Sequence, residues 1–397
     1  MESAESAGDS GEGATMTCIW TIQEGHRRRA VSVPMLAVSS TTLIGVAALT
    51  IDVGSLLRAR EESQIAADSA ALAGAMELLD RDKLSGTPDM TEEIIAARQA
   101  ALNYAARNEV INAAPELDPD QDVEVGYMED LNFPNAALAF DDPNLFNTVM
   151  VRVHGSVAMS FASIFGIHMS QAGAMGAATY KDGVVGFRVT PDSGPAGLMP
   201  FALHIDAWEG LLADTWTSSD SWAYDPDTDS VGSGSDNIRE LNLYPGAGTD
   251  QLPPGNFGTV DIGSSNNSTA VIERQILYGI TAEDLEWHGG ELVLNADGEL
   301  FVEGDTGLSA GIKDELEAII GEPRTILLFN HVEGPGNNAV YTIVGFAGIR
   351  VMYVKLTGAM HTKKLLIQPE FVTDDAAITD AGPGQSYFVL QPVLLTR

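Results

Sequence analysis

The sequence has almost no cysteine and little positive charge, and each shortage excludes a class of protein. Cys18 is the only cysteine among 397 residues, so no disulfide bond can form within the chain. There are 21 Lys and Arg residues against 56 Asp and Glu residues, which gives a formal net charge of −35. An acidic surface of this size repels phosphate groups and anionic lipid. The composition therefore argues against nucleic-acid and phosphate binding, and it favours solubility or cation binding.

The common catalytic motifs are also missing. The seven histidines show no HxxxH or HExxH spacing, and no glycine-rich phosphate loop ends in Lys-Ser or Lys-Thr. Ser233 and Ser309 lie in glycine-rich surroundings, and we interpret each as a loop serine and not as a nucleophile. We therefore expect a protein that is not an enzyme.

The longest apolar run extends from Ala30 to Ile51, and no ionisable residue lies inside it. About 20 helical residues cross the hydrocarbon core of a membrane, so this run is long enough to span one. Arg27 to Arg29 precede the run and Asp52 follows it. Since a positive cluster stays on the cytoplasmic side, we predict a single-pass anchor in the cytoplasmic membrane. The N-terminus is then inside, and the chain beyond Asp52 is periplasmic or extracellular.

Two other interpretations of this run are open. A buried core helix rarely runs this long without a charge and rarely has three arginines at one end. A cleaved secretory signal usually has a shorter apolar core, and no clear small-x-small cleavage site follows this run before the helix continues. The polar patch from Ser39 to Thr42 is unusual for a membrane span, but Ser and Thr hydroxyls can bond back to helix carbonyls.

The residues before the anchor predict a disordered segment, because residues 1–25 are mostly acidic and small. Met16 is an alternative start. Cys18 has no hydrophobic segment in front of it, which argues against lipidation. Five acidic residues and three arginines precede the anchor, a net charge of −2, so −33 of the total lies beyond it.

The anchor helix is expected to continue to about Leu79, because no proline occurs from Val53 to Leu79 and alanine is frequent there. Gly74 is a weak point that costs about 1 kcal/mol relative to alanine. The alanines permit close packing on the chain's own domain, or on other copies or subunits, and the sequence does not decide between these. An apolar stripe is formed by Leu57, Ile65, Leu72 and Met76.

Two signatures at this spacing carry a family resemblance. Asp52-Val53-Gly54 follows the apolar run, and AADSAALAGA occupies Ala66 to Ala75. The order of basic residues, apolar helix, DVG-like turn and AADAAALAGA-like end resembles that of the TadE/TadG-like proteins of Flp (Tad) pilus assembly. The resemblance implies a membrane-anchored, pilin-like component that works with other Tad pilus-assembly subunits or pilins.

One departure from pilins concerns processing. Pilins that a prepilin peptidase cleaves have a glutamate at the fifth position after a glycine, whereas Ala30 is the fifth residue after Gly25. We therefore expect the anchor to remain joined to the arginines.

A second patch resembles the same family. Beyond a breaker at Ser85 to Asp89, the sequence predicts a helix from Thr91 to about Asn108 and strands at Asp122–Met128 and Asn147–Val157. The segment from Val151 to Tyr180 then resembles the strand, FARIFG-like helix and alanine-rich strand of the Tad family. The match is carried by Phe161, Ala162, Phe165 and Gly166.

From Gly183 onward the sequence predicts a mostly β domain with helical insertions at Ile272–Tyr278 and Ala310–Ile320. Pro253–Gly263 and Gly304–Leu316 resemble recurring features of long TadG-like proteins. The predicted strands are Leu292–Asn295, Thr325–Asn330, Val340–Val354, Lys364–Ile367 and Tyr387–Leu395.

One group of acids in this domain is spaced like a calcium loop. Asp225, Asp227 and Asp229 occupy positions 1, 3 and 5, and Asp236 occupies position 12. Calcium prefers several oxygen ligands on a flexible loop. Ser230 replaces the glycine expected at position 6, so an acidic surface turn fits as well as a calcium site. No other cofactor is expected.

Together these features predict an α+β protein with a long transmembrane, pilin-like helix, a small α+β unit and a mostly β C-terminal domain. The predicted function is a TadG-type structural or assembly component of a Tad/Flp type IV pilus, without catalysis. The alternative is a surface-anchored, adhesin-like binding module whose β domain can bind calcium. The expected parts are the disordered N-terminus 1–25, the anchor and extended helix 26–80, the α+β unit 81–181 and the extracytoplasmic β domain 182–397.

Overall fold

The computed structural model describes residues 29–79, 81–85, 89–128, 137–216, 218–244, 257–263, 268–305, 310–334, 338–359, 362–379 and 385–396. These residues form two compact units, one of 29–55 with 158–170 and the other of 56–157 with 171–396. The boundaries at 25, 80 and 181 stay predictions. Several sequence features lie outside the described residues, namely the segment 1–25, Arg27, Arg28, residues 86–88 of the breaker, and residues 253–256 and 306–309.

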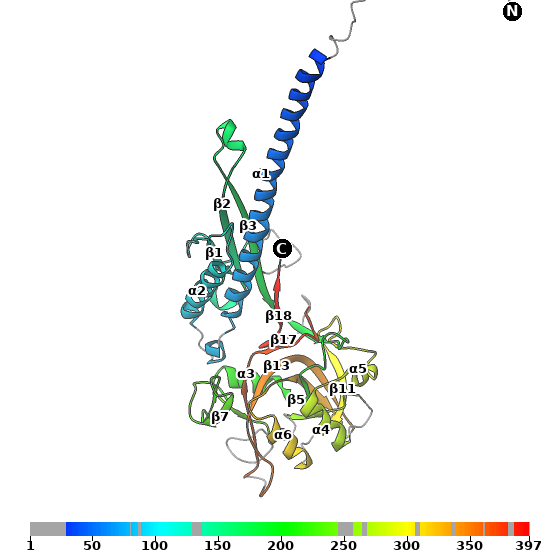
Figure 1. Cartoon of the computed structure of the whole chain (residues 1–397). Coiled ribbons are helices and arrows are strands. Elements are labelled where there is room, and N and C mark those ends of the chain that lie inside the picture. Colours follow the sequence, from blue (N-terminus) through cyan, green and yellow to red (C-terminus); the bar gives the residue numbers. More distant parts are fainter. Residues whose placement is uncertain are drawn as a thin grey trace, which may run out of the picture. The chain divides into compact units, whose positions relative to one another are not determined.

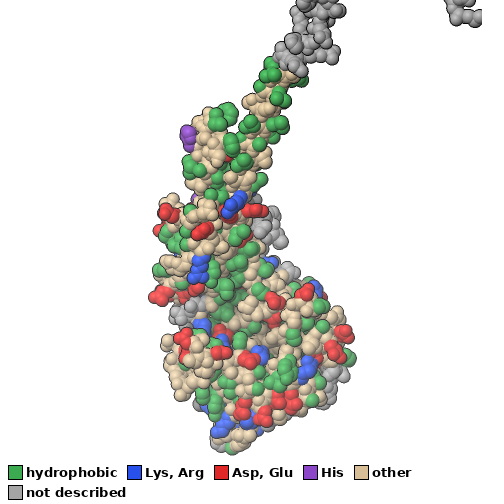
Figure 2. All heavy atoms as spheres, in the orientation of Figure 1, with side chains coloured by type: hydrophobic (Ala, Val, Ile, Leu, Met, Phe, Trp, Pro, Cys, Tyr) green, Lys and Arg blue, Asp and Glu red, His purple; other side chains and the backbone are tan. Residues whose placement is uncertain are grey.

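Helix α1 runs without a break from Arg29 to Met76, which confirms the predicted continuation beyond the apolar run (Figure 1). From Ser32 onward it is long and apolar enough to cross a membrane, and its apolar stretch shows no charged side chain (Figure 2). The polar patch is satisfied within the helix, because Ser40 Oγ and Thr41 Oγ1 donate to the carbonyls of Leu36 and Ala37 at 2.6 and 2.8 Å. Ser39 Oγ and Thr42 Oγ1 donate in the same way to the carbonyls of Met35 and Val38. The four hydroxyls of the patch therefore do not prevent a membrane span.

The region after α1 is a small α+β arrangement, as predicted. The helix expected from Thr91 and both expected strands are present, whereas the FARIFG-like segment forms only one 3₁₀ turn, η3. The elements are η1 (Arg81–Ser85), α2 (Thr91–Arg107), β1 (Val123–Gly126), η2 (Pro143–Leu145), β2 (Thr148–Ala158), η3 (Ala162–Phe165) and β3 (Met169–Lys181).

The alanines of α1 pack on the chain's own domain, which answers the question that the sequence left open. We call them the alanine face: Ala59, Ala66, Ala67, Ala70, Ala71 and Ala75, all fully buried. Strand β3 lies directly on this face, since a Cβ on Gly176 would stand 2.6 Å from the Ala67 carbonyl carbon. Only glycine permits so close an approach of strand to helix.

Gly74 has a similar role on the side of α2. A Cβ at this position would stand 2.9 Å from both the Ala97 carbonyl oxygen and Val149 Cγ1. Its poor helix propensity, about 1 kcal/mol relative to alanine, is therefore offset by the packing of α1 against α2 and β2. The sequence predicted that Gly74 weakens the helix, but it did not predict the close packing that requires a glycine there.

The C-terminal part is mostly β, as predicted, and short helices lie between its strands along the chain (Figure 1). Strands β11, β9, β5, β12 and β13 are hydrogen-bonded in that order, and β13 pairs again with β11, which closes a ring. The strands are β4 (Val184–Phe187), β5 (Leu198–His204), β6 (Trp222–Asp225), β7 (Ser230–Ser233), β8 (Leu241–Asn242), β9 (Phe257–Val260), β10 (Leu292–Val293), β11 (Leu300–Asp305), β12 (Pro323–Glu333), β13 (Ala339–Lys355), β14 (Lys364–Pro369), β15 (Val372–Thr373), β16 (Ala377–Thr379), β17 (Gln385–Tyr387) and β18 (Val389–Leu395). The helices are α3 (Ile205–Leu212), α4 (Thr269–Tyr278), α5 (Ala282–Glu286), the 3₁₀ turn η4 (Ala310–Ile312) and α6 (Lys313–Ala318).

The main sheet is buried on both faces, so its strands are almost continuously apolar. In β12, Ile326 and Leu328 face the core that also contains Trp208 of α3. Leu327 and Phe329 face the second core, with Phe346. Adjacent residues of a strand point to opposite faces, which is why an uninterrupted apolar run fits this strand.

The last strand returns to the sheet of the small α+β region. Strand β18 pairs antiparallel with β3, with Leu394 opposite Thr179 and Leu395 opposite Ala178. The sheet order is β1-β2-β3-β18-β15. The C-terminal strand therefore covers an edge of β3 that would otherwise be unpaired.

Replacing Gly176 with alanine tests the close packing of β3 on α1. We expect Gly176→Ala to lower the free energy of unfolding by about 1–3 kcal/mol, because the added methyl group meets helix backbone that cannot move aside. Gly232→Ala in β7 is the control, since a Cβ there meets nothing within 4 Å. Denaturant unfolding of the detergent-solubilised full chain is the measurement, and equal midpoints for the two variants would contradict the expectation.

Candidate functional site

The Asp52 carboxylate binds the turn that joins β2 to β3. It accepts hydrogen bonds from the backbone N–H groups of Ser160, Phe161 and Ala162 at 2.9, 3.0 and 2.6 Å. The carboxylate is only 5% exposed. Hydrogen bonds to an ionised acceptor are stronger than neutral ones, so this contact, which we call the Asp52 clamp, fixes the turn on α1.

The clamp joins the two sequence patches that were recognised separately. Asp52 belongs to the DVG signature, and the bound amides open the FARIFG-like segment. The first N–H groups of a helical turn have no partner within it, so a carboxylate at that end supplies one. Gly166 closes the turn with φ of 84°, a conformation that favours glycine.

Three large apolar side chains of α1 beyond the anchor are exposed. Leu57, Ile65 and Met76 are 62%, 59% and 66% exposed, and we call these three the stripe. Leu72, which the sequence placed in the same stripe, is partly covered. A soluble helix normally turns such residues inward. The stripe is thus a set of three large apolar side chains that the described part of the chain leaves exposed.

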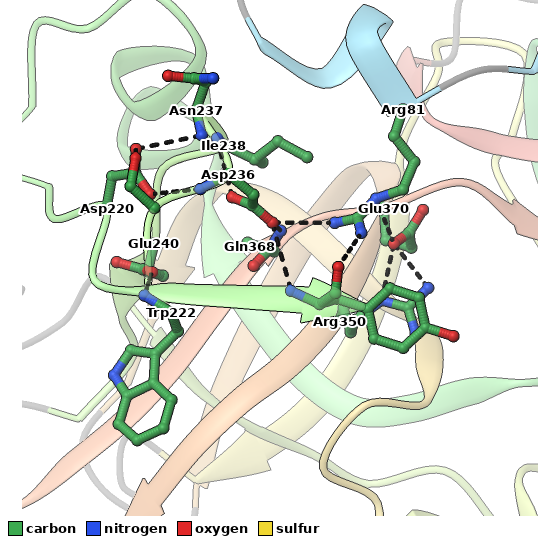
Figure 3. Close-up of polar contacts among 12 residues, drawn as sticks. Arg81, Asp220, Trp222, Asp236, Asn237, Ile238, Glu240, Arg350, Gln368 and Glu370 are labelled. Carbon is green, nitrogen blue, oxygen red and sulfur yellow. Dashed lines mark hydrogen bonds and ion pairs between the residues drawn. The ribbon is translucent and has the colours of Figure 1, made fainter. Parts of the chain in front are cut away.

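A buried ion pair lies within the main sheet of the C-terminal part. Arg350 of β13 and Glu370, which follows β14, have Nη2 and Oε2 2.7 Å apart, and Arg350 Nε donates to the same carboxylate at 2.7 Å. Both residues are less than 10% exposed. The guanidinium also stacks on the Tyr224 ring, 3.5 Å from its centroid. This pair is the centre of the polar contacts in Figure 3.

Arg81 of η1, the turn that follows α1, forms ion pairs with this part of the sheet. Its Nε lies 3.4 Å from Glu370 Oε2, and its Nη2 lies 3.4 Å from Asp236 Oδ2. Figure 3 shows Arg81 reaching from η1 toward both carboxylates. The four residues Arg81, Asp236, Arg350 and Glu370, here called the charge cluster, connect η1 to the C-terminal sheet.

Two further buried polar groups hold neighbouring segments. Glu240 accepts hydrogen bonds from Ser219 Oγ at 2.7 Å and from the Trp222 amide at 2.6 Å, and burial raises the pKa of its carboxyl. Burial lowers the pKa of Lys83 to about 8, although Glu93 and Asp182 act in the opposite direction. Lys83 Nζ donates to Tyr180 Oη at 3.0 Å, so it holds η1 on β3.

The acids of the predicted calcium loop are divided between two environments. Asp225 and Asp229 lie in the β6–β7 hairpin, where Asp225 accepts the Asp227 amide at 2.9 Å and Asp229 accepts the Tyr224 hydroxyl at 2.8 Å. Asp236 belongs to the charge cluster and also accepts from Gln368 Nε2 at 3.1 Å. Among the described residues, no group of three or more His, Cys, Asp or Glu is placed to hold a metal ion. Calcium binding stays a prediction.

The two serines considered earlier give no catalytic arrangement among the described residues. Ser233 ends the short hairpin strand β7. Ser309 stands in a Gly-x-Ser-x-Gly sequence but lies outside the described residues. The preceding strand, β11, pairs antiparallel with both neighbours, whereas a nucleophile elbow follows a strand of an α/β-hydrolase sheet.

The charge cluster was missed from the sequence, although one signal was available. Arg350 interrupts an apolar run of β13, and an arginine at such a position is usually paired when it is buried. The sequence gives no indication of the partner, since Glu370 lies on another segment. For the Asp52 clamp, both partners were singled out but their contact was not foreseen.

Comparison with protein families finds two overlapping matches, both within residues 30–178. Residues 30–77 match the family model described as Flp pilus-assembly TadE/G-like. Residues 73–178 match the model described as Tad-like Flp pilus-assembly. No curated protein and no solved structure matches the chain significantly. The two matches end just before the C-terminal part.

Removing one member of the buried ion pair tests the charge cluster. We expect Arg350→Met to lower the free energy of unfolding by about 3–5 kcal/mol, because it leaves the Glu370 carboxylate buried without its main partner. The double variant Arg350→Met/Glu370→Leu should recover part of the loss. Arg239→Ala, which breaks the exposed pair with Asp214, is the control and should change stability little. A loss for Arg350→Met no larger than that of the control would contradict this role.

Proposed function

The chain belongs to the TadE/TadG-like family of Flp pilus-assembly proteins, and on this basis we propose that it is a TadG-type structural component of a Tad pilus system, without catalysis. Helix α1 anchors it in the cytoplasmic membrane through Ala30 to Ile51. The part of the helix beyond the anchor binds other pilus-assembly subunits or pilins.

The exposed stripe is the observation that carries this proposal. The alanine face of α1 is already used within the chain, so it is not available to a partner. Leu57, Ile65 and Met76 are large, apolar and exposed. Large exposed apolar side chains mark interaction sites when they gather on one surface, and an apolar ridge along a helix suits the helix of another subunit.

Orientation and the division into parts belong to the same proposal. Arg27 to Arg29 stay in the cytoplasm because only this end of the anchor carries a positive cluster. The α+β unit (81–181) and the β domain (182–397) are then extracytoplasmic. The high negative charge beyond the anchor suits an exposed, soluble surface.

The alternative function is a surface-anchored, adhesin-like module. It is favoured by one observation, namely that the C-terminal β domain (182–397) lies outside both family matches. In that case the β domain binds a surface or ligand, with or without calcium, and the stripe has no assembly role.

Charged substitutions on the stripe separate the two functions. We expect Leu57→Glu/Ile65→Glu to abolish or strongly reduce pilus formation, counted by electron microscopy in the strain that encodes the chain. Thermal unfolding should change little, because both side chains are exposed in the monomer. Phe301→Glu, at a position 59% exposed on β11, is the matched control. Normal pili in the stripe variant would favour the adhesin-like alternative, in which the stripe has no assembly role.

Reporter fusions test the orientation. A periplasm-dependent reporter fused after Leu79 should be active, since the positive cluster keeps the other end of the anchor inside. The same reporter fused before Arg27 serves as the control and should be inactive. Activity of a cytoplasm-dependent reporter after Leu79 would contradict the orientation.

A further inference from the structure

We propose that the turn between β2 and β3 is a second membrane contact, which dips into the outer interfacial layer of the bilayer beside the anchor. We call this segment, Phe161 to Met169, the tip. Ile164 and Phe165 are 78% and 85% exposed, and Ile167 and Met169 are more than half exposed. The proposal rests on the anchor being membrane-spanning, and it adds a second element at the same membrane surface.

The charge pattern around the tip fits a lipid surface. From Gly155 to Tyr180 there is no Lys, Arg, Asp or Glu, in a chain whose net charge is −35. The acidic remainder of the chain is repelled by anionic lipid, but this hairpin is not. Phe and Ile are among the side chains that favour the apolar side of a membrane interface.

The Asp52 clamp sets the level of the tip along the helix. Asp52 directly follows the last residue of the apolar run, and it holds the amides of Ser160 to Ala162. Ala48 lies one turn earlier on the same helix face and is 8% exposed. It is the only buried residue among the described residues 32–51. The two side chains are about 6 Å apart along the helix axis, so the tip covers the outer end of the anchor itself.

Several backbone amides in and beside the tip are hydrogen-bonded within the protein, as a lipid environment requires. An unpaired N–H group is costly in lipid, so membrane-facing backbone must be satisfied internally. Besides the three amides on Asp52, the Met159 amide donates to the His168 carbonyl at 3.0 Å, and the Ile167 amide donates to the Ala162 carbonyl at 3.1 Å. The clamp thus supplies acceptors to amides that otherwise need water.

A single-cysteine design tests the tip, because Cys18 is the only native cysteine. In a Cys18→Ser background, Phe165→Cys, Leu49→Cys and Phe301→Cys are labelled with a nitroxide in the full chain, reconstituted into lipid vesicles. Leu49 reports the anchor and Phe301 reports a water-exposed position of β11. We expect the label at 165 to collide with oxygen more than with a water-soluble nickel complex, as at 49, and the label at 301 to show the reverse.

Each other outcome overturns the proposal. A water-like label at 165 beside a lipid-like label at 49 leaves the anchor intact but places the tip in water. A label at 165 that is shielded from both reagents shows that a protein, such as a second copy, covers the tip. Water-like labels at both 165 and 49 reject the anchor together with the tip.

The role of the clamp is tested by Asp52→Ala in the Phe165→Cys chain. Without the carboxylate the tip loses its fixed position on α1, so the oxygen preference at 165 should fall several-fold. The same substitution in the Leu49→Cys chain is the control and should leave the label at 49 in lipid. An unchanged label at 165 would show that the clamp does not position the tip.

Discussion

The close approach of strand β3 to the backbone of α1 is the constraint on which the family-related region depends. An α-helix can meet a strand at this distance only where both surfaces are made of the smallest residues, here the alanine face and Gly176. That requirement explains why alanine is so frequent in this part of α1, since other residues with high helix propensity are too large for the contact. It also decides which face of α1 is left over. Once the small residues are used inside the chain, the large apolar residues of the stripe are the ones that remain exposed.

Two carboxylates then fix segments that packing alone would leave loose. Asp52 holds a turn by its backbone amides, and Glu370 holds Arg350 and Arg81 by their guanidinium groups. A buried pair contributes little net stability compared with apolar residues of the same size, but breaking it is expensive. Both contacts therefore mainly fix the relative positions of segments that are distant in the sequence.

Most of the elements could be predicted from the sequence, because their patterns are local. The uninterrupted α1, the helix from Thr91 and the strands β1, β2, β12, β13 and β14 follow from alanine content, periodicity and breakers, whereas β5 and β11 were missed. Helix α3 was missed, because its eight residues are short and follow a buried strand directly. The register of the sheet and the pairing of β18 with β3 could not be predicted, since they depend on contacts between remote segments. For the same reason the sequence identified Asp52 and the FARIFG-like turn but not the bonds between them.

The proposed function depends on which face of α1 is buried and which is exposed. If the alanine face had been exposed, the helix would resemble those that pack tightly on copies of themselves through small residues. Because that face is occupied, an interaction through the stripe must involve larger side chains and a wider separation between helices. Such contacts tolerate changes in partner better than glycine-like packing does, because no backbone contact constrains them.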